Sequence, residues 1–250
     1  MASFFKKIVR CFKYPSSLPR SYREMRDSRQ KSRRIENARR LLDSNGVLEL
    51  LTPGDDSEIA PSLSDLANLY QLVRDRKPRV VLELGIGFST IVIAEALRQN
   101  LSKHKVPGHL FTVDAQESWI ENTRAKIPEN LRDFVTIQFS TISVRLIEGT
   151  LCHAYDSLPD VSPNFIYVDG PEGVEVGGDI NGLGFTRGRS VISIEPLLYE
   201  STAPLDYFVL VDGRWETCRF LSVHLKGKYR HQQSVSRKFG TFEYLSREYF

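Results

Sequence analysis

Short apolar runs alternate with amphipathic stretches along most of the chain after residue 60. Runs with β-branched or aromatic residues start near Val80, His109, Phe134, Asn164 and Asp206, and helix-period patterns follow most of them. Repeated strand-then-helix units are typical of parallel sheets with helices on both faces. The pattern predicts an α/β fold with a doubly wound, mostly parallel sheet.

The segments between and after these runs complete the expected fold. Further helices are predicted from Pro61 to before Pro78, over Ser190–Tyr199 and over Glu216–Leu225, and two closing strands over Tyr229–Val235 and Gly240–Leu245. The stretch Cys152–Pro159 is predicted to be a loop or short helix, with His153 favoured as a structural histidine over a catalytic base. Gly177–Gly184 is a glycine-rich loop that could cover a substrate.

The N-terminal residues follow a different pattern. Met1–Tyr14 alternates apolar and basic residues, which fits a short interfacial anchor as well as it fits a frayed or docked terminus. After two prolines, Ser21–Leu42 is predicted to be a charged helix with few apolar positions. We therefore expect a basic helical arm over residues 1–45 and one α/β domain over residues 46–250.

Charge is distributed unevenly between these two parts. The net charge of the chain is +3, but residues 1–40 hold thirteen Lys and Arg against three acids, a balance of +10 that leaves −7 for the rest. The basic arm predicts peripheral contact with an anionic membrane surface. Nucleic-acid binding is disfavoured, because the arm lacks interleaved aromatic residues beyond Tyr22.

Composition and cysteine usage suggest where the protein works. A chain of 250 residues with 41% hydrophobic residues can bury one sizeable core. The three cysteines are widely separated and form no C-x-x-C pair, which argues against a disulfide framework or a zinc cluster. No run reaches the length of a membrane span, so a cytoplasmic location is expected, with the inner face of the membrane as a further possibility.

The first strand leads into the most informative turn of the chain. The apolar run Val80–Leu82 stops at Glu83-Leu84-Gly85-Ile86-Gly87-Phe88-Ser89-Thr90, and a helix pattern starts at once. Two glycines let the backbone turn tightly and approach a ligand, while the unpaired N–H groups of the helix face the same place. A dinucleotide fingerprint needs a third glycine where Thr90 stands, which disfavours NAD.

The acid before this turn points to another cofactor. Glu83-x-Gly85-x-Gly87 resembles motif I of the class I S-adenosylmethionine (SAM) dependent methyltransferases, with Ser89 at the usual place of a third glycine. The resemblance covers about residues 61–250 and implies a seven-stranded sheet with an antiparallel last strand. It also implies that SAM is held by the motif residues, by Asp114 at the tip of the second strand through the ribose hydroxyls, and by Ser140 near the adenine.

Two further acids are expected at neighbouring strand tips. Val168-Asp169-Gly170 ends the fourth strand and Val211-Asp212-Gly213 the fifth, so both carboxylates should lie beside the cofactor. This pairing resembles a bacterial branch of predicted methyltransferases, and the two acids resemble the metal-binding acids of catechol-type and sugar O-methyltransferases. Gly213 replaces the second acid or amide of those enzymes, so a metal-free catalytic cluster of Asp169, Asp212 and Arg214 is favoured over a Mg²⁺ site.

These features predict an O-methyltransferase that acts on a small molecule or a glycan. Asp169 is the expected substrate-side base, because a hydroxyl acceptor must lose a proton on methylation. The alternatives are a non-catalytic protein and an NAD- or nucleotide-binding one, either of them recruited to a membrane or an acidic partner through the basic arm. For the strand tips, the simpler alternative is that Asp169 and Asp212 cap the helices or turns that follow them.

Overall fold

The computed structural model describes residues 20–51, 62–185, 191–234 and 239–246, and the side chains of all of these except 20–29 and 246. Two compact units are present, Met1–Asn68 and Leu69–Phe250. The expected segments Met1–Tyr14 and Ser190 lie outside the described residues. The predicted domain boundary at residue 45 stays a prediction.

The first unit contains the charged helix that the sequence predicts. Helix α2 runs over Arg20–Ser44, and the short 3-10 helix η2 follows over Leu48–Leu50. The helix ends at a turn in which Gly46 adopts a φ of +68° and Val47 N donates to Leu42 O at 2.8 Å. Exposed basic side chains cover the described part of α2: Lys31, Arg33, Arg34, Arg39 and Arg40.

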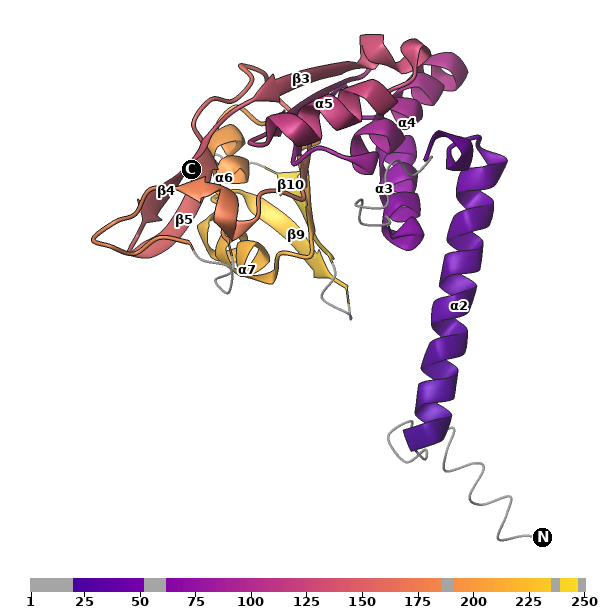
Figure 1. The fold of residues 1–250 in the computed structure, drawn as a ribbon, viewed down its shortest axis with the longest axis horizontal. Helices are drawn as coiled ribbons and strands as arrows, with labels where there is room; N and C mark the ends of the chain where they lie inside the picture. The colour runs from indigo at the N-terminus through magenta and orange to yellow at the C-terminus, as the bar shows by residue number, and fades with distance from the viewer. Residues whose placement is uncertain (1–19, 52–61, 186–190, 235–238, 247–250) are drawn as a thin grey trace, which may run out of the picture. The chain divides into compact units, whose positions relative to one another are not determined.

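The second unit is built on a seven-stranded sheet (Figure 1). Its strand order is β3-β2-β1-β6-β8-β10-β9, with all neighbours parallel except β10, which runs antiparallel to both β8 and β9. The predicted doubly wound sheet with an antiparallel last strand is therefore confirmed. The strands are β1 (Val80–Leu84), β2 (His109–Asp114), β3 (Val135–Phe139), β6 (Phe165–Val168), β8 (Phe208–Asp212), β9 (Lys228–Gln233) and β10 (Phe239–Ser246).

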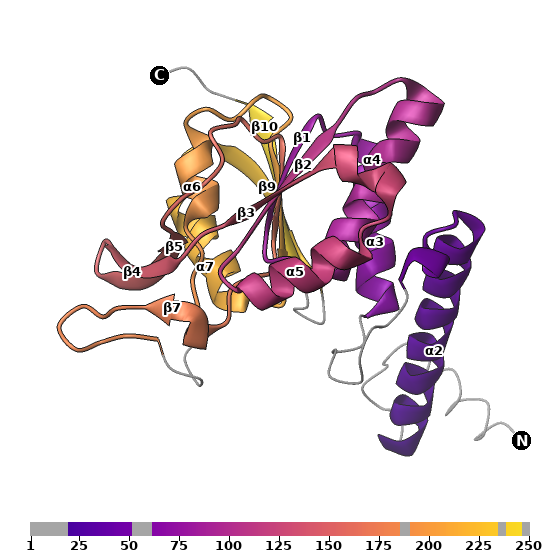
Figure 2. The same cartoon turned by 45° about the horizontal axis from the view of Figure 1, so that its top comes forward.

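Helices cover both faces of this sheet. Figure 2 shows the sheet nearly edge-on, with α4 and α5 on one side and α6 and α7 on the other. The central strands are apolar along almost their whole length because both faces are covered. The helical segments are α3 (Leu63–Arg76), α4 (Phe88–His104), α5 (Glu117–Lys126), η3 (Glu129–Phe134), η4 (Gly173–Glu175), α6 (Glu195–Glu200) and α7 (Trp215–His224).

A second, three-stranded sheet includes residues for which the sequence predicts a loop or short helix. Strands β4 (Ile142–Ile147) and β5 (Thr150–Tyr155) form a hairpin, and β7 (Val176–Gly177) pairs with β4. The expectation for residues 152–155 is wrong, because these residues form a strand. Cys152 and Ala154 pack in one cluster and Tyr155 in the main core, so apolar residues occupy both faces and hide the strand period.

Candidate active site

The two motif glycines have different surroundings. Gly85 has a φ of +100°, and a Cβ built on it would lie 2.7 Å from Gly170 N, in the turn after β6. A side chain is therefore excluded at Gly85 by backbone conformation and by the neighbouring main chain. Gly87 has an extended φ of 169°, and a Cβ there would meet nothing within 4 Å. Gly87 thus borders open space at the start of α4.

Glu83 lies beneath this turn. Its side chain is fully buried, and Oε2 accepts a hydrogen bond of 2.6 Å from Thr90 Oγ1, which in turn accepts the N–H of Gly87 at 3.1 Å. Burial raises the pKa of Glu83 to about 8, although the hydroxyls of Ser89, Thr90 and Thr112 oppose the rise. Among the described residues, Oε1 has no partner of good hydrogen-bond geometry. Glu83 therefore fixes the turn from within.

Asp114 joins two loops at the tip of β2. Its Oδ2 accepts the N–H of Ile86 at 3.0 Å, and its Oδ1 accepts the N–H of Gln116 at 2.8 Å. Burial raises the pKa of Asp114, while these two N–H donors lower it. The acid thus stands next to the Gly85–Gly87 turn, as the sequence predicts for a residue that contacts the ribose. Each oxygen keeps a second lone-pair direction for another donor.

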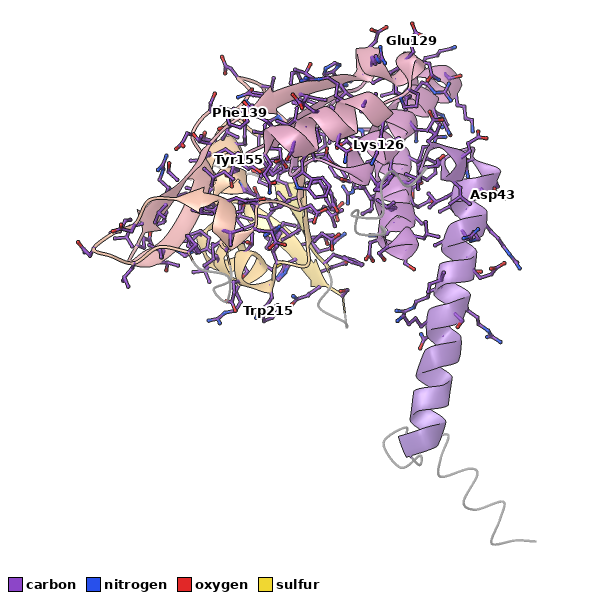
Figure 3. The ribbon with its side chains drawn as sticks, in the orientation of Figure 1. Asp43, Lys126, Glu129, Phe139, Tyr155 and Trp215 are labelled. Atoms are coloured by element: carbon purple, nitrogen blue, oxygen red, sulfur yellow. The ribbon has the colours of Figure 1, made fainter. Side chains whose placement is uncertain are left out.

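Ser140 is at the tip of β3 but its hydroxyl is already used. Ser140 Oγ donates to Thr141 O at 2.9 Å and accepts the N–H of Ser157 at 2.9 Å, and the residue is buried. These bonds fasten the end of the β4–β5 hairpin to the end of β3. Figure 3 marks the two strand ends concerned, Phe139 in β3 and Tyr155 in β5. Contact between Ser140 and an adenine remains a prediction.

Asp169 and Asp212 are brought together by strand register. Val168 pairs with Val211, so the next residue on each parallel strand is an aspartate at the same level. The hydroxyl of Tyr167 lies between the two carboxylates, 3.2 Å from Asp169 Oδ2 and 3.0 Å from Asp212 Oδ2. The sequence predicts the two acids as neighbours, and the structure adds the hydroxyl that links them.

Tyr167 was missed as a site residue because it lies in an apolar strand and is buried. Burial and the two aspartates raise its pKa well above the usual value, so the phenol keeps its proton. The missed signal is the strand period, since residues two apart share one face of a strand and Tyr167 precedes Asp169 by two. A tyrosine two residues before a strand-tip acid can reach that acid.

Arg214 faces the turn after β6 through its described hydrogen bonds. Its Nη1 donates to the carbonyl of Pro171 at 2.6 Å and its Nη2 donates to the carbonyl of Asp169. The guanidinium thereby holds the main chain beside Asp169. Its Nε is buried and has no partner among the described residues. The predicted cluster of Asp169, Asp212 and Arg214 is thus assembled at one sheet edge, with Arg214 bonded to main-chain carbonyls.

The residues around the turn fit a SAM-type cofactor. Open space beside Gly87, the N-terminus of α4 and the carboxylate of Asp114 lie together at the carboxyl end of β1. This is the switch point of the sheet, since β2 and β6 leave β1 on opposite sides. Within the described residues, no group of three or more His, Cys, Asp or Glu is arranged to hold a metal ion, and no helix could cross a membrane.

Comparisons with known proteins agree with this geometry. Residues 82–180 match the model of a family described as a methyltransferase domain. The fold resembles that of the SAH-bound methyltransferase PaMTH1 from Podospora anserina, with 14% identity, a TM-score of 0.54, and coverage of 92% of this chain and 99% of that one.

A second solved structure is more distant. The O-methyltransferase TomG from Streptomyces achromogenes, solved with SAM, has 15% identity and a TM-score of 0.46, with coverage of 86% of this chain and 90% of that chain. No curated protein sequence matches this chain. The chain therefore matches a methyltransferase-domain family over residues 82–180, and its fold is similar to that of a SAH-bound methyltransferase.

Proposed function

We propose that the protein transfers the methyl group of SAM to a hydroxyl oxygen of a small molecule or a glycan. The observation that carries the proposal is the position of Asp169, whose exposed carboxylate lies at the tip of β6, the strand beside β1. A hydroxyl acceptor needs a group that takes its proton, and a carboxylate next to the cofactor site can do so. SAM supplies an electrophilic methyl group when bound.

The proposed binding residues divide into two groups. Gly85, Gly87 and Ser89 shape the turn that would face the methionine part, with Glu83 supporting it from below through Thr90. Asp114 would accept the ribose hydroxyls, and Ser140 is assigned to the adenine side. The cradle at Gly87 supports this arrangement, since only a residue without a side chain leaves that space open.

The proposed reaction is a direct displacement. The acceptor oxygen forms a bond to the methyl carbon while the bond from sulfur to that carbon breaks, and Asp169 takes the hydroxyl proton. The products are the methyl ether and S-adenosylhomocysteine. Tyr167 holds Asp169 and Asp212 through one hydroxyl, and Arg214 holds the main chain of the same turn. Most of the rate enhancement would then come from the alignment of the acceptor oxygen with the methyl carbon, and proton removal by Asp169 would add to it.

Methyl transfer can be tested before the acceptor is identified. Full-length protein is incubated with SAM carrying a tritiated methyl group and with fractionated cell extract, and labelled products are isolated. We expect label in a hydroxyl-bearing small molecule or glycan, and Asp169→Asn should lower kcat about 100-fold with SAM affinity nearly unchanged. Label on protein or RNA, or normal turnover by Asp169→Asn, would contradict the proposal.

We also propose that residues 1–40 bring the protein to anionic surfaces. The described part of α2 supports this, since five basic side chains are exposed over fifteen residues while Glu36 and Asp43 are the acids there. Basic side chains close to a bilayer are attracted to its anionic headgroups. Contact of this kind would place the enzyme near membrane-associated acceptors.

A further inference from the structure

One hydrogen bond joins the two sides of the switch point. Gln116 Nε2 donates to Glu175 Oε1. Gln116 follows β2 at the start of α5, whereas Glu175 follows β6 in η4. Because β1 lies between β2 and β6 in the sheet, this bond connects loops that leave the sheet on opposite sides of the motif strand. Ligands of open α/β sheets bind between such loops.

Both partners are tied to the candidate site. The N–H of Gln116 donates to Asp114 Oδ1 at 2.8 Å, which anchors that side to the proposed ribose acid. Glu175 Oε2 accepts the N–H of Glu172 at 2.7 Å, in the segment that begins at Asp169. The proximity of Glu175 also raises the pKa of Asp114, so the two carboxylates are close enough to interact. The link is therefore part of the cofactor region.

The link depends on a short segment. Glu175 ends a 3-10 helix of three residues, and Val176 then pairs with Ile142 in the small sheet. Gln116 and Glu175 are each only partly buried, so the bond between them can break without exposing core residues. A single hydrogen bond to a charged group, placed across a binding crevice, can set the rate at which the crevice opens.

We propose that Gln116 and Glu175 form a latch across the cofactor crevice, which opens to admit SAM and closes again over it. The inference rests on the proposed SAM site. It assigns both residues a role in cofactor exchange that differs from direct contact. A latch that is equally closed with and without SAM slows association and dissociation by the same factor, and it leaves the equilibrium affinity unchanged.

The test is the kinetics of SAM binding to the full chain. Association is followed by stopped-flow tryptophan fluorescence, for which Trp119 in α5 is a nearby reporter, and dissociation by rapid filtration of tritiated SAM. In Gln116→Ala and Glu175→Ala we expect both rate constants to rise about tenfold, with Kd within about twofold of wild type. The double variant should be no faster than the single ones, because each change breaks the same bond.

A matched control comes from α3. Gln71 Nε2 donates to Asp75 at 2.9 Å, so Gln71→Ala breaks a similar glutamine–carboxylate pair outside the crevice and should leave both rates unchanged. Unchanged rates in the crevice variants would overturn the latch. A higher dissociation rate constant with an unchanged association rate constant, and hence weaker binding, would also overturn it. That result would mean that Gln116 or Glu175 contacts SAM directly. Failure of wild-type protein to bind SAM would instead refute the proposed function.

Discussion

At the scale of single residues, Gly85 and Gly87 are two positions apart but differ in what prevents a side chain. The main chain of Gly170 excludes a Cβ at Gly85, so that glycine is required for folding. Gly87 has room for a Cβ and an ordinary extended backbone, so folding does not require glycine there. The proposed SAM site would account for glycine at this motif position, because a bound ligand could then approach the backbone. The sequence motif alone could not separate these two reasons.

The two alanine variants should therefore behave differently. Gly87→Ala should change the free energy of unfolding by less than about 0.5 kcal/mol. The same variant should bind SAM at least about tenfold more weakly, because the alanine side chain would enter the space proposed for the cofactor. Gly85→Ala should cost about 2 kcal/mol or more of stability. Urea unfolding and calorimetry measure the two effects. Wild-type SAM affinity in Gly87→Ala would show that the open space does not belong to the cofactor.

Glu83 should make stability depend on pH. Its pKa rises from an ordinary value near 4.5 in the unfolded chain to about 8 in the fold, so the folded state binds the extra proton between these values. The stability contribution is full below about pH 4.5 and is lost as the pH rises towards 8. Relative to Glu83→Gln, wild type should lose about 2–3 kcal/mol between pH 5 and 7, measured by urea unfolding without SAM. Parallel curves for the two proteins would contradict this.

At the scale of elements, the sequence predicts the strands that form continuous buried runs. β1 and β2 lie within a residue or two of their expected bounds, and α4 follows the glycine turn as expected, because an apolar strand, a glycine turn and a helix period each leave a clear pattern. The helix itself starts earlier than expected, at Phe88, and continues to His104. The β4–β5 hairpin does not leave such a pattern, since β5 carries apolar residues on both faces. The residues Glu148 and Gly149, both with positive φ, form its two-residue turn, and this Gly-containing turn was the overlooked signal.

His153 in β5 gives this hairpin its own pH response. The ring is fully buried, neither nitrogen has a partner among the described residues, and burial, assisted by Arg214, lowers its pKa to about 3. The unfolded chain therefore binds more protons below about pH 6.5, and stability is lost as the pH falls from there towards 3. This neutral ring fits the structural role favoured from the sequence.

Replacement of His153 by Leu, a side chain of similar volume, should remove that response. Between pH 7.5 and 5, wild type should lose about 2 kcal/mol more than His153→Leu in the free energy of unfolding. His109→Leu is a control, because His109 is less buried and its pKa is lowered from the same ordinary value without such a large shift. An equal loss in wild type and His153→Leu would mean that the ring is protonated in the folded state.

At the scale of the whole molecule, the basic arm and the rest of the chain carry opposite charge. The arm has a net charge of +10 within residues 1–40 and the rest has −7. Each basic residue close to an anionic bilayer contributes about 1 kcal/mol, and salt weakens this attraction. Deletion of residues 1–40 should therefore abolish co-sedimentation with vesicles of phosphatidylserine and phosphatidylcholine, and leave SAM affinity unchanged. Equal sedimentation of full-length and shortened protein, at low salt, would exclude the arm as the membrane contact.

The alternation of strands and helices along the chain explains how much of the molecule could be predicted from sequence. The fold class and the edge of the sheet that carries the site follow from strand–helix alternation, and register then places Asp169 beside Asp212. The roles of Tyr167, Gln116 and Glu175 could not be predicted, because their contacts depend on how strand tips and loops meet in three dimensions. The acceptor of the proposed reaction could not be predicted either, and the labelling experiment would reveal it.

Isothermal titration of the full chain with SAM tests the central claim most directly. We predict saturable binding of one SAM per chain, at least about tenfold weaker binding by Gly87→Ala, and no heat from NAD under the same conditions. Asp114→Ala should weaken SAM about 30- to 150-fold, because a charged hydrogen-bond acceptor is worth about 2–3 kcal/mol. Binding of NAD in preference to SAM, or no binding of SAM by folded wild-type protein, would contradict the assignment of this site to SAM.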